Sequence, residues 1–175
     1  GPDLESIVAL DPDLVIRFAG EQDPRTVSRL DALGIPHLAV RPDHVEDIYL
    51  MFDLLGYATG RSEAADSVSG VIRSEMAEIA DTYRTASLLR VAYVLGGTPP
   101  WVSGPGTYID EVLTVLGARN VFSDLDNLYA AVSPEEFRVR DIDVVVTSSA
   151  GDFDPGLAPE ARVVTVGGDL EVPGP

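Results

Sequence analysis

The feature that most constrains the fold is a long run of helical periodicity from Arg61 to Leu88. At 1.5 Å per residue, a helix of this length extends roughly 35–40 Å, which is comparable to the width of a small domain. The segment is therefore long enough to connect two separate lobes. Its apolar residues recur every three or four positions, as an amphipathic helix requires: Ala64, Ala65, Val68, Val71, Ile72, Met76, Ile79 and Tyr83.

The charge and composition exclude several classes of protein. Acidic residues number 29 and basic residues 12, which gives a net charge of −17 and no basic cluster. This balance repels nucleic acids and anionic membranes, so we expect no nucleic-acid partner. The absence of cysteine excludes disulfides, thiolate metal sites and cysteine nucleophiles. A hydrophobic content of 45% is sufficient for a folded core.

On both sides of the long helix, short apolar segments typical of strands alternate with helical segments. Before it, strands are predicted at residues 13–18 and 35–40 and helices at residues 23–33 and 43–55. After it, strands are predicted at residues 89–95, 143–148 and 162–166, with helices at residues 107–116 and after Ser133, and loops at residues 96–106 and 125–132.

This alternation predicts an α/β fold with two small α/β lobes, each built on a central sheet, joined by one long backbone helix. We place the N-terminal lobe at residues 1–60, the connecting helix at residues 61–88 and the C-terminal lobe at residues 89–175.

Two distant segments of the chain share one pattern. DLESIVALDPDLVI, residues 3–16, aligns without a gap with SPEEFRVRDIDVVV, residues 133–146, and each indicates a capped helix that leads into a buried strand. The alignment pairs Glu5 with Glu135 in the first helical turn, where a carboxylate is stabilised by about 0.3–1 kcal/mol. The two glutamates therefore either stabilise their helices or dock a symmetric basic partner.

Motifs for catalysis and metal binding are absent from the sequence. His37 and His44 lack the spacing of a zinc site, so we interpret both as structural residues. The acidic residues do not follow the order of a calcium loop. No GxGxxG, GxxxxGK[ST] or GxSxG motif occurs. We therefore expect a binding protein rather than an enzyme, without a resident metal or cofactor.

A family resemblance rests on five segments: DLESIVALDPDLVI, LDALGIPHLAV, the long helix, YVLGGTPPWVSGPGTYIDEVLTVLGARNVF, and AAVSPEEF followed by DVVV. Together they resemble the class III periplasmic substrate-binding proteins, a family with a helical backbone that serves ABC importers of cobalamin, siderophores and haem. The segment PPWVSGPGTYIDEVL is the most specific and is most similar to the cobalamin-binding type. The resemblance implies a corrinoid ligand, with a ferric siderophore or haem as the alternative.

The resemblance also implies how the chain works and which residues contribute. A ligand is enclosed between the lobes and delivered to an ABC permease, in the periplasm or another extracytoplasmic space, with or without a lipid anchor. A flat, bulky ligand needs aromatic faces and a few polar anchors. The resemblance assigns the aromatic faces to Phe18, Trp101 and Tyr129 and the permease contacts to Glu5 and Glu135.

Three of the candidate residues keep a second interpretation. Trp101 either contacts the ligand or covers the end of the second sheet. Arg17 either anchors a carboxylate or phosphate or pairs with a neighbouring acidic residue. Asp169 either faces the ligand or caps the turn formed with Gly167 and Gly168.

Compared with the family, elements are missing before Gly1 and after Pro175, so we expect truncation at both termini and an incomplete N-terminal lobe. An incomplete lobe would have an open sheet edge, which favours pairing with another chain. The alternative hypothesis is therefore a reduced interaction or sensor module that lost its binding cleft and self-associates through this edge.

Overall fold

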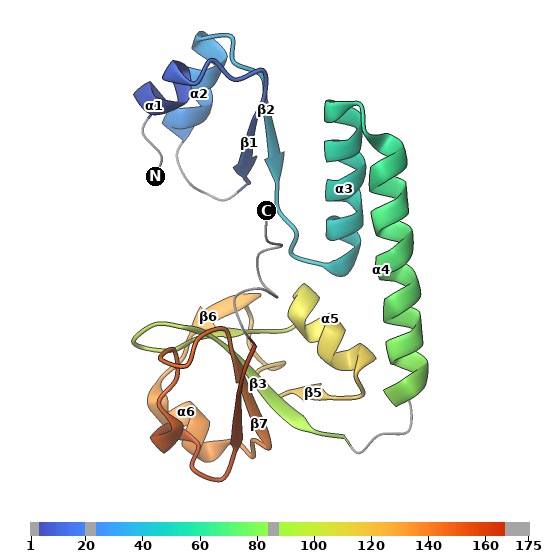
Figure 1. Ribbon diagram of the computed structural model, residues 1–175. Coiled ribbons are helices and arrows are strands. Elements are labelled where there is room, and N and C mark those ends of the chain that lie inside the picture. Colours follow the sequence, from blue (N-terminus) through green and yellow to red (C-terminus); the bar gives the residue numbers. More distant parts are fainter. Residues whose placement is uncertain (1–3, 20–23, 84–87, 167–175) are drawn as a thin grey trace. The chain divides into compact units, whose positions relative to one another are not determined.

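The computed structural model describes residues 4–19, 24–83 and 88–166. The chain divides into two compact units, residues 1–42 and residues 43–175, whose elements Figure 1 labels.

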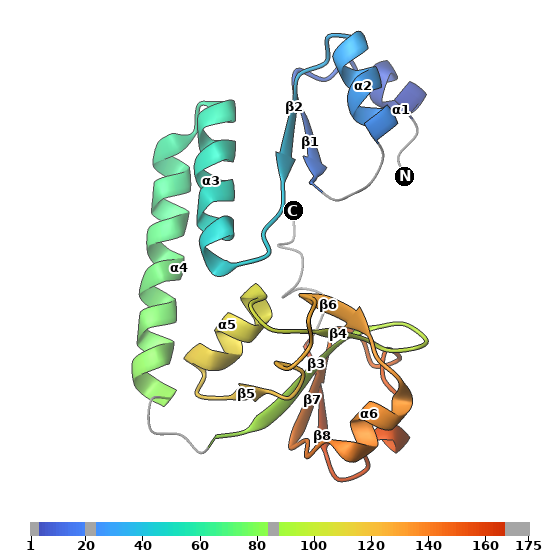
Figure 2. The ribbon, with the colours of Figure 1, turned by 180° about the vertical axis from the view of Figure 1, so that it is seen from behind.

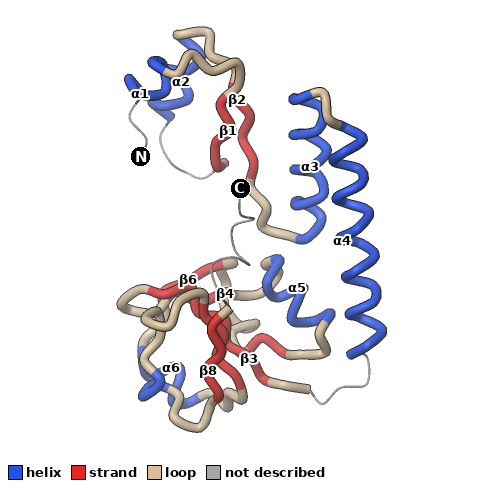
Figure 3. Tube along the Cα trace, in the orientation of Figure 1, coloured by secondary structure: helices blue, strands red, loops and turns tan. Residues whose placement is uncertain are grey.

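The first unit is built on a pair of parallel strands. Helix α1 (Leu4–Ala9) precedes strand β1 (Val15–Phe18), and helix α2 (Pro24–Ala32) connects β1 to strand β2 (His37–Val40). The strands pair in register from Val15 with His37 to Phe18 with Val40, and Figure 3 shows them side by side. Leu30 of α2 is fully buried. This strand–helix–strand order is the one that the sequence predicts.

The second unit begins with two helices that contact each other, α3 (Val45–Thr59) and α4 (Ser62–Tyr83). They lie side by side in both ribbon views (Figures 1 and 2). Gly56 allows this approach, because a Cβ atom there would lie 2.6 Å from that of Ala65. The long helix is confirmed over residues 62–83. Residues 84–87 are outside the described residues, and Leu88, which the sequence assigns to the helix, is not helical.

The boundary between the units differs from the predicted lobe boundary. The first unit ends at Pro42, whereas the sequence extends the N-terminal lobe to residue 60. Helix α3 contacts α4 and α5 of the second unit. Its position follows from tertiary packing, which the amphipathic pattern of a single helix does not specify.

The sheet of the second unit has the strand order β6-β4-β3-β7-β8, with β5 paired to β3. Strands β5, β7 and β8 run parallel to their neighbours, whereas β4 is antiparallel to both β3 and β6. The elements are β3 (Arg90–Gly96), β4 (Trp101–Ser103), α5 (Tyr108–Val115), β5 (Arg119–Asn120), β6 (Tyr129–Ala131), α6 (Pro134–Val139), β7 (Val144–Thr147), a 3₁₀ helix (Pro155–Leu157) and β8 (Arg162–Thr165).

Helices cover both faces of this sheet. Successive side chains of a strand point to opposite faces, so Val91 of β3 packs with Ile109 of α5, whereas Ala92 packs in the cluster that contains Phe137 of α6. Figures 1 and 2 show α5 and α6 on opposite sides of the sheet. The α/β fold class predicted from the sequence is confirmed. Within the described residues, we find no helix that combines the length and hydropathy needed to span a bilayer.

The internal similarity is visible in the secondary structure. Helices α1 and α6 each have six residues, and their first residues, Leu4 and Pro134, are 130 positions apart (134 − 4). Each helix leads into a parallel strand. The predicted cap at Ser133 is wrong, because its side chain makes no capping hydrogen bond, and the carboxylate of Glu136 instead accepts a hydrogen bond from Arg140.

Candidate ligand-binding site

Trp101 is the first residue of β4 and the only tryptophan of the chain. Its side chain is 49% exposed. The indole packs against Gly97, where a Cβ atom would lie 3.2 Å from Trp101 Cδ1. Because Gly97 also has a φ of +95°, a side chain here would be strained as well as crowded. A glycine at position 97 therefore leaves the space that the indole occupies.

Trp101 and Tyr129 lie on the same face of the sheet. Strand β4 pairs with β6 so that Trp101 is opposite Ala131 and Ser103 is opposite Tyr129. Directly opposed residues of antiparallel strands share a face, as do residues two apart on one strand. The two aromatic residues are thus diagonal neighbours, which is a spacing that large side chains can bridge.

The sequence places both aromatic residues in loops, and this prediction is wrong. Each is in a three-residue strand, β4 or β6, that forms because it pairs with strands elsewhere in the chain. Tyr129 is half-buried and also packs against the core cluster of Val91, Ile109 and Leu113. It therefore contributes to the core as well as to the face that carries Trp101.

Phe18 and Arg17 end strand β1 in the first unit. Phe18 is 67% exposed. The Nε of Arg17 donates a hydrogen bond to Nδ1 of His37 over 3.4 Å, and Nε2 of His37 lies 3.0 Å from Oδ1 of Asp31. The sequence suggested that Arg17 binds a ligand anion or pairs with an acidic residue. In the structure its described hydrogen bond is instead to a histidine, His37. The structural role predicted for His37 agrees with this chain of contacts.

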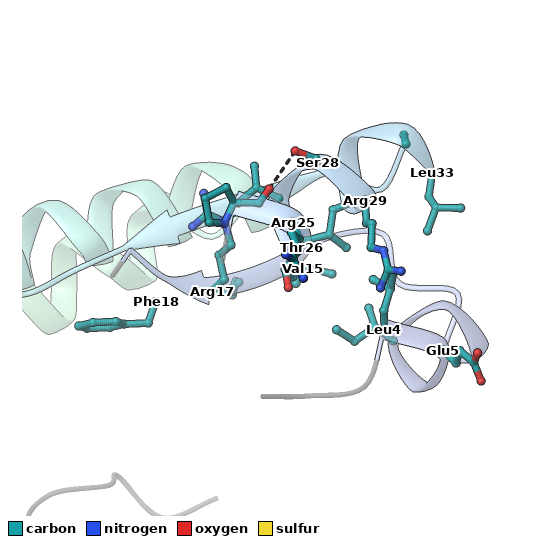
Figure 4. A pocket seen from close by; sticks show the side chains of 16 residues that line it. Leu4, Glu5, Val15, Arg17, Phe18, Arg25, Thr26, Ser28, Arg29 and Leu33 are labelled. Carbon is teal, nitrogen blue, oxygen red and sulfur yellow. Dashed lines mark hydrogen bonds between the residues drawn. The ribbon is translucent and has the colours of Figure 1, made fainter. Parts of the chain in front are cut away.

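The first unit also has an open concavity of about 1370 Å³. Figure 4 shows its lining, with Phe18 at one end and Glu5 at the other. Residues of α1, β1 and α2 form the wall, and Ser28 Oγ donates a hydrogen bond to the carbonyl of Pro24 on this wall. Sequence reasoning missed the concavity because it interpreted this segment as a buried strand, whereas Ile16 and Phe18 of β1 are exposed.

The two glutamates occupy equivalent places in the two units. Glu5 is in the first turn of α1 and Glu135 in the first turn of α6, and both side chains are exposed. Asp169, the remaining predicted site residue, lies outside the described residues. Among the residues that the structure describes, no group of three or more His, Cys, Asp or Glu side chains could hold a metal ion.

The most strongly perturbed ion pair is remote from Trp101 along the sheet. Hydrogen bonds from the Arg90 side chain, followed by those from its backbone N–H, lower the pKa of Asp143 to about 2. Arg90 begins β3 and Asp143 precedes β7, whereas Trp101 follows the end of β3. This pair thus connects the amino ends of two central strands, β3 and β7, whereas Trp101 lies beyond the carboxyl end of β3.

A family model described as "Periplasmic binding protein" matches residues 1–159. The chain therefore belongs to the periplasmic binding protein family, and the resemblance to class III substrate-binding proteins is confirmed. Membership in a family of binding proteins agrees with the expectation of binding rather than catalysis.

Among curated relatives, the chain is 30% identical over 148 residues to the vitamin B12-binding protein of Yersinia pestis (strain Pestoides F), with 85% of this chain and 53% of the relative covered. The vitamin B12-binding protein of Yersinia pseudotuberculosis serotype O:3 (strain YPIII) matches to the same extent. The chain thus spans about half the length of the curated relatives that it matches.

Solved structures share the fold. The periplasmic vitamin B12-binding protein BtuF of Vibrio cholerae matches with a TM-score of 0.75 and 23% identity, over 95% of this chain and 69% of that chain. The periplasmic haem-binding protein HutB of Vibrio cholerae matches with a TM-score of 0.80 and 18% identity, over 99% of this chain and 75% of that chain. At these identities, the matches show the fold alone.

Proposed function

We propose that this chain is the ligand-capturing part of a substrate-binding protein that binds a corrinoid and delivers it to an ABC permease. The observation that carries the proposal is the half-exposed indole of Trp101, held on the same sheet face as Tyr129. Aromatic faces of this kind suit a flat macrocycle. The vitamin B12-binding relatives support a corrinoid, and haem or a ferric siderophore is the second candidate.

In this mechanism, the protein binds its ligand without covalent chemistry. Trp101 contributes apolar area on a backbone that Gly97 and the pairing with β6 hold in place. A pre-ordered aromatic side chain loses little conformational entropy when a ligand covers it. Tyr129 extends the same face, and Phe18 provides a separate aromatic contact in the first unit. Arg17 and Asp169 remain predicted polar contacts.

The test is a titration of Trp101 fluorescence in the complete protein expressed from its natural reading frame. Cyanocobalamin, cobinamide, haem and a ferric siderophore are added separately, with correction for their absorbance. We expect saturable binding of a corrinoid at about micromolar or lower concentration. Calorimetry with Trp101→Ala should show at least about tenfold weaker binding.

Tyr57→Ala is the matched control, because Tyr57 is an exposed aromatic residue of α3 outside the candidate site. Its affinity should equal that of the unmodified protein. Tight binding of haem or the siderophore alone would instead name the second candidate. A folded protein that binds none of the four ligands would overturn the transport proposal and favour the self-associating module, which sedimentation would then test.

We further propose that Glu5 and Glu135 contact basic residues of the permease. Glu5→Lys and Glu135→Lys should each weaken stimulation of the transporter ATPase in reconstituted vesicles while leaving ligand affinity unchanged. Glu75→Lys, at an exposed position of α4, controls for the change in net charge. Equal stimulation by all three variants would contradict the docking roles. We place the protein in the periplasm, as the family indicates, and lipid anchoring remains a prediction.

A further inference from the structure

Two adjacent glycines at the end of β3 are flanked by a carboxylate and an indole. A Cβ atom at Gly96 would lie 3.2 Å from Cγ of Asp152, and one at Gly97 would lie 3.2 Å from Cδ1 of Trp101. Both glycines have positive φ, +100° and +95°. Asp152 and Trp101 therefore approach consecutive residues of the same backbone segment, which has no side chains to separate them from it.

The carboxylate of Asp152 is held by its own loop. Its backbone N–H donates to the carbonyl of Ser149 over 3.1 Å, and Ser148 Oγ lies 3.1 Å from Oδ2 of Asp152 and donates to it. In the described part of the chain, Oδ1 accepts no hydrogen bond, and the side chain is partly exposed. One carboxylate oxygen is thus fixed, while the other can accept a hydrogen bond from a ligand.

The carboxylate of Asp152 lies at the carboxyl ends of the parallel strands β3 and β7. The loop of Asp152 follows β7, and Gly96 ends β3, which is the parallel neighbour of β7. Ligands of open α/β sheets bind at the carboxyl ends of the parallel strands, where loops from neighbouring strands meet. Asp152 lies at this end of the sheet, in a loop that approaches Gly96. The next residue, Gly97, contacts Trp101.

We propose that Asp152 determines specificity at the site of Trp101 by selecting ligands that present carboxamide N–H groups over ligands that present carboxylates. The inference rests on the proposed function and names the ligand chemistry that the site favours. A carboxylate accepts strong hydrogen bonds from amide donors, whereas it repels a ligand carboxylate at close range. A cobalamin carries carboxamides at the periphery of its ring, whereas haem carries carboxylates there.

The experiment compares cyanocobalamin with its separated monocarboxylates, in which one peripheral carboxamide has been hydrolysed. Calorimetry on the complete protein measures each affinity for the unmodified protein and for Asp152→Asn. We expect the unmodified protein to prefer cyanocobalamin over at least one monocarboxylate by about tenfold or more. Asp152→Asn should reduce that preference to about twofold, because the variant binds this monocarboxylate more tightly.

Asp154→Asn is the control, since Asp154 is an exposed carboxylate two residues away that accepts a hydrogen bond from Gly156 N–H. Its preference should match that of the unmodified protein. If Asp152→Asn does not fold, Ser148→Ala replaces it, and loss of the orienting hydroxyl should lower the same preference about threefold.

The outcomes separate the inference from the function on which it rests. If the unmodified protein binds cyanocobalamin but Asp152→Asn keeps every preference unchanged, the role of Asp152 is overturned and the corrinoid function stands. The role of Asp152 is equally overturned if the unmodified protein binds all monocarboxylates as tightly as cyanocobalamin. If the unmodified protein binds no corrinoid, the proposed function itself fails.

Discussion

The side chain of Arg90 binds the carboxylate of Asp143 through two hydrogen bonds, 3.0 Å from Nε to Oδ2 and 2.8 Å from Nη2 to Oδ1. The backbone N–H of Arg90 adds a third, 2.8 Å from Oδ2. These contacts connect the starts of β3 and β7, the two central parallel strands of the second unit.

This pair predicts a specific acid sensitivity. The pKa of Asp143 is lowered to about 2 in the folded protein, below the value of about 3.9 that is usual for an unfolded chain. The resulting stabilisation is therefore complete above about pH 4 and is lost as the pH falls through the folded-state pKa. Melting temperatures measured by circular dichroism should fall over this window, and the fall should be smaller in Asp143→Asn.

Asp66→Asn serves as the control for this prediction, because Asp66 is an exposed carboxylate of α4 with no hydrogen bond or ion pair among the described residues. It should retain the acid-induced fall. The same slope in Asp143→Asn and in the unmodified protein would show that the pair does not contribute.

Arg140 connects α6 to the segment that follows β5. Its guanidinium contacts Asp124 at 2.7 Å and Glu136 at 3.0 Å, and it lies over the ring of Phe122. Because the side chain is only 20% exposed, Arg140→Met should lower the free energy of unfolding by about 1–3 kcal/mol. Urea denaturation measures this change. Arg138→Met, at an exposed position of the same helix, should change it by less than about 0.5 kcal/mol, and equal losses would contradict the prediction.

Phe137 is the central ring of an aromatic cluster. Its centroid lies 5.2 Å from that of Phe122 and 5.0 Å from that of Phe153, and its side chain is 2% exposed. We expect Phe137→Ala to lower the free energy of unfolding by about 3–5 kcal/mol, because it removes buried apolar area and leaves a cavity. Val139→Ala, at a 78% exposed position of the same helix, should have little effect in the same urea denaturation series.

Gly97 predicts a link between backbone conformation and the aromatic site. Gly97→Ala should shift the emission maximum of Trp101 in the ligand-free protein and weaken ligand binding at least about tenfold, because the new methyl group occupies the space beside the indole. Gly60→Ala is the control: Gly60 also has positive φ, but a Cβ atom there would meet nothing within 4 Å. An unchanged emission maximum in Gly97→Ala would show that position 97 does not set the place of the ring.

The elements that were predicted correctly are those with strong local signals. The periodicity of α4 and the alternation of strands and helices are set by residues close in sequence. The helices predicted at residues 23–33 and 107–116 correspond to α2 and α5. The start of α5 is set locally, because the Thr107 side chain accepts a hydrogen bond from the backbone N–H of Asp110. The equivalence of α1 and α6 was detectable because each is a short local pattern.

The candidate site was predicted only in part. The sequence and its family resemblance named Trp101 and Tyr129, but they assigned both to loops. Local composition could not predict β4 and β6, because each has three residues and exists only through pairing with a neighbouring strand. Asp152 was missed for a similar reason, since its approach to Gly96 joins a loop to the end of β3 across more than 50 residues of sequence (152 − 96).

The sequence by itself determined the α-helices, the strands β1, β2, β3, β7 and β8, the α/β class and the family. Helical periodicity, strand hydrophobicity and turn residues act over a few neighbouring positions, which is why these features could be predicted. Tertiary structure alone decided that α3 packs with α4, that Trp101 and Tyr129 share a sheet face, and that Arg90 holds Asp143. These relationships connect residues far apart in the chain, and they are fixed by backbone pairing and close packing that no short stretch of sequence encodes.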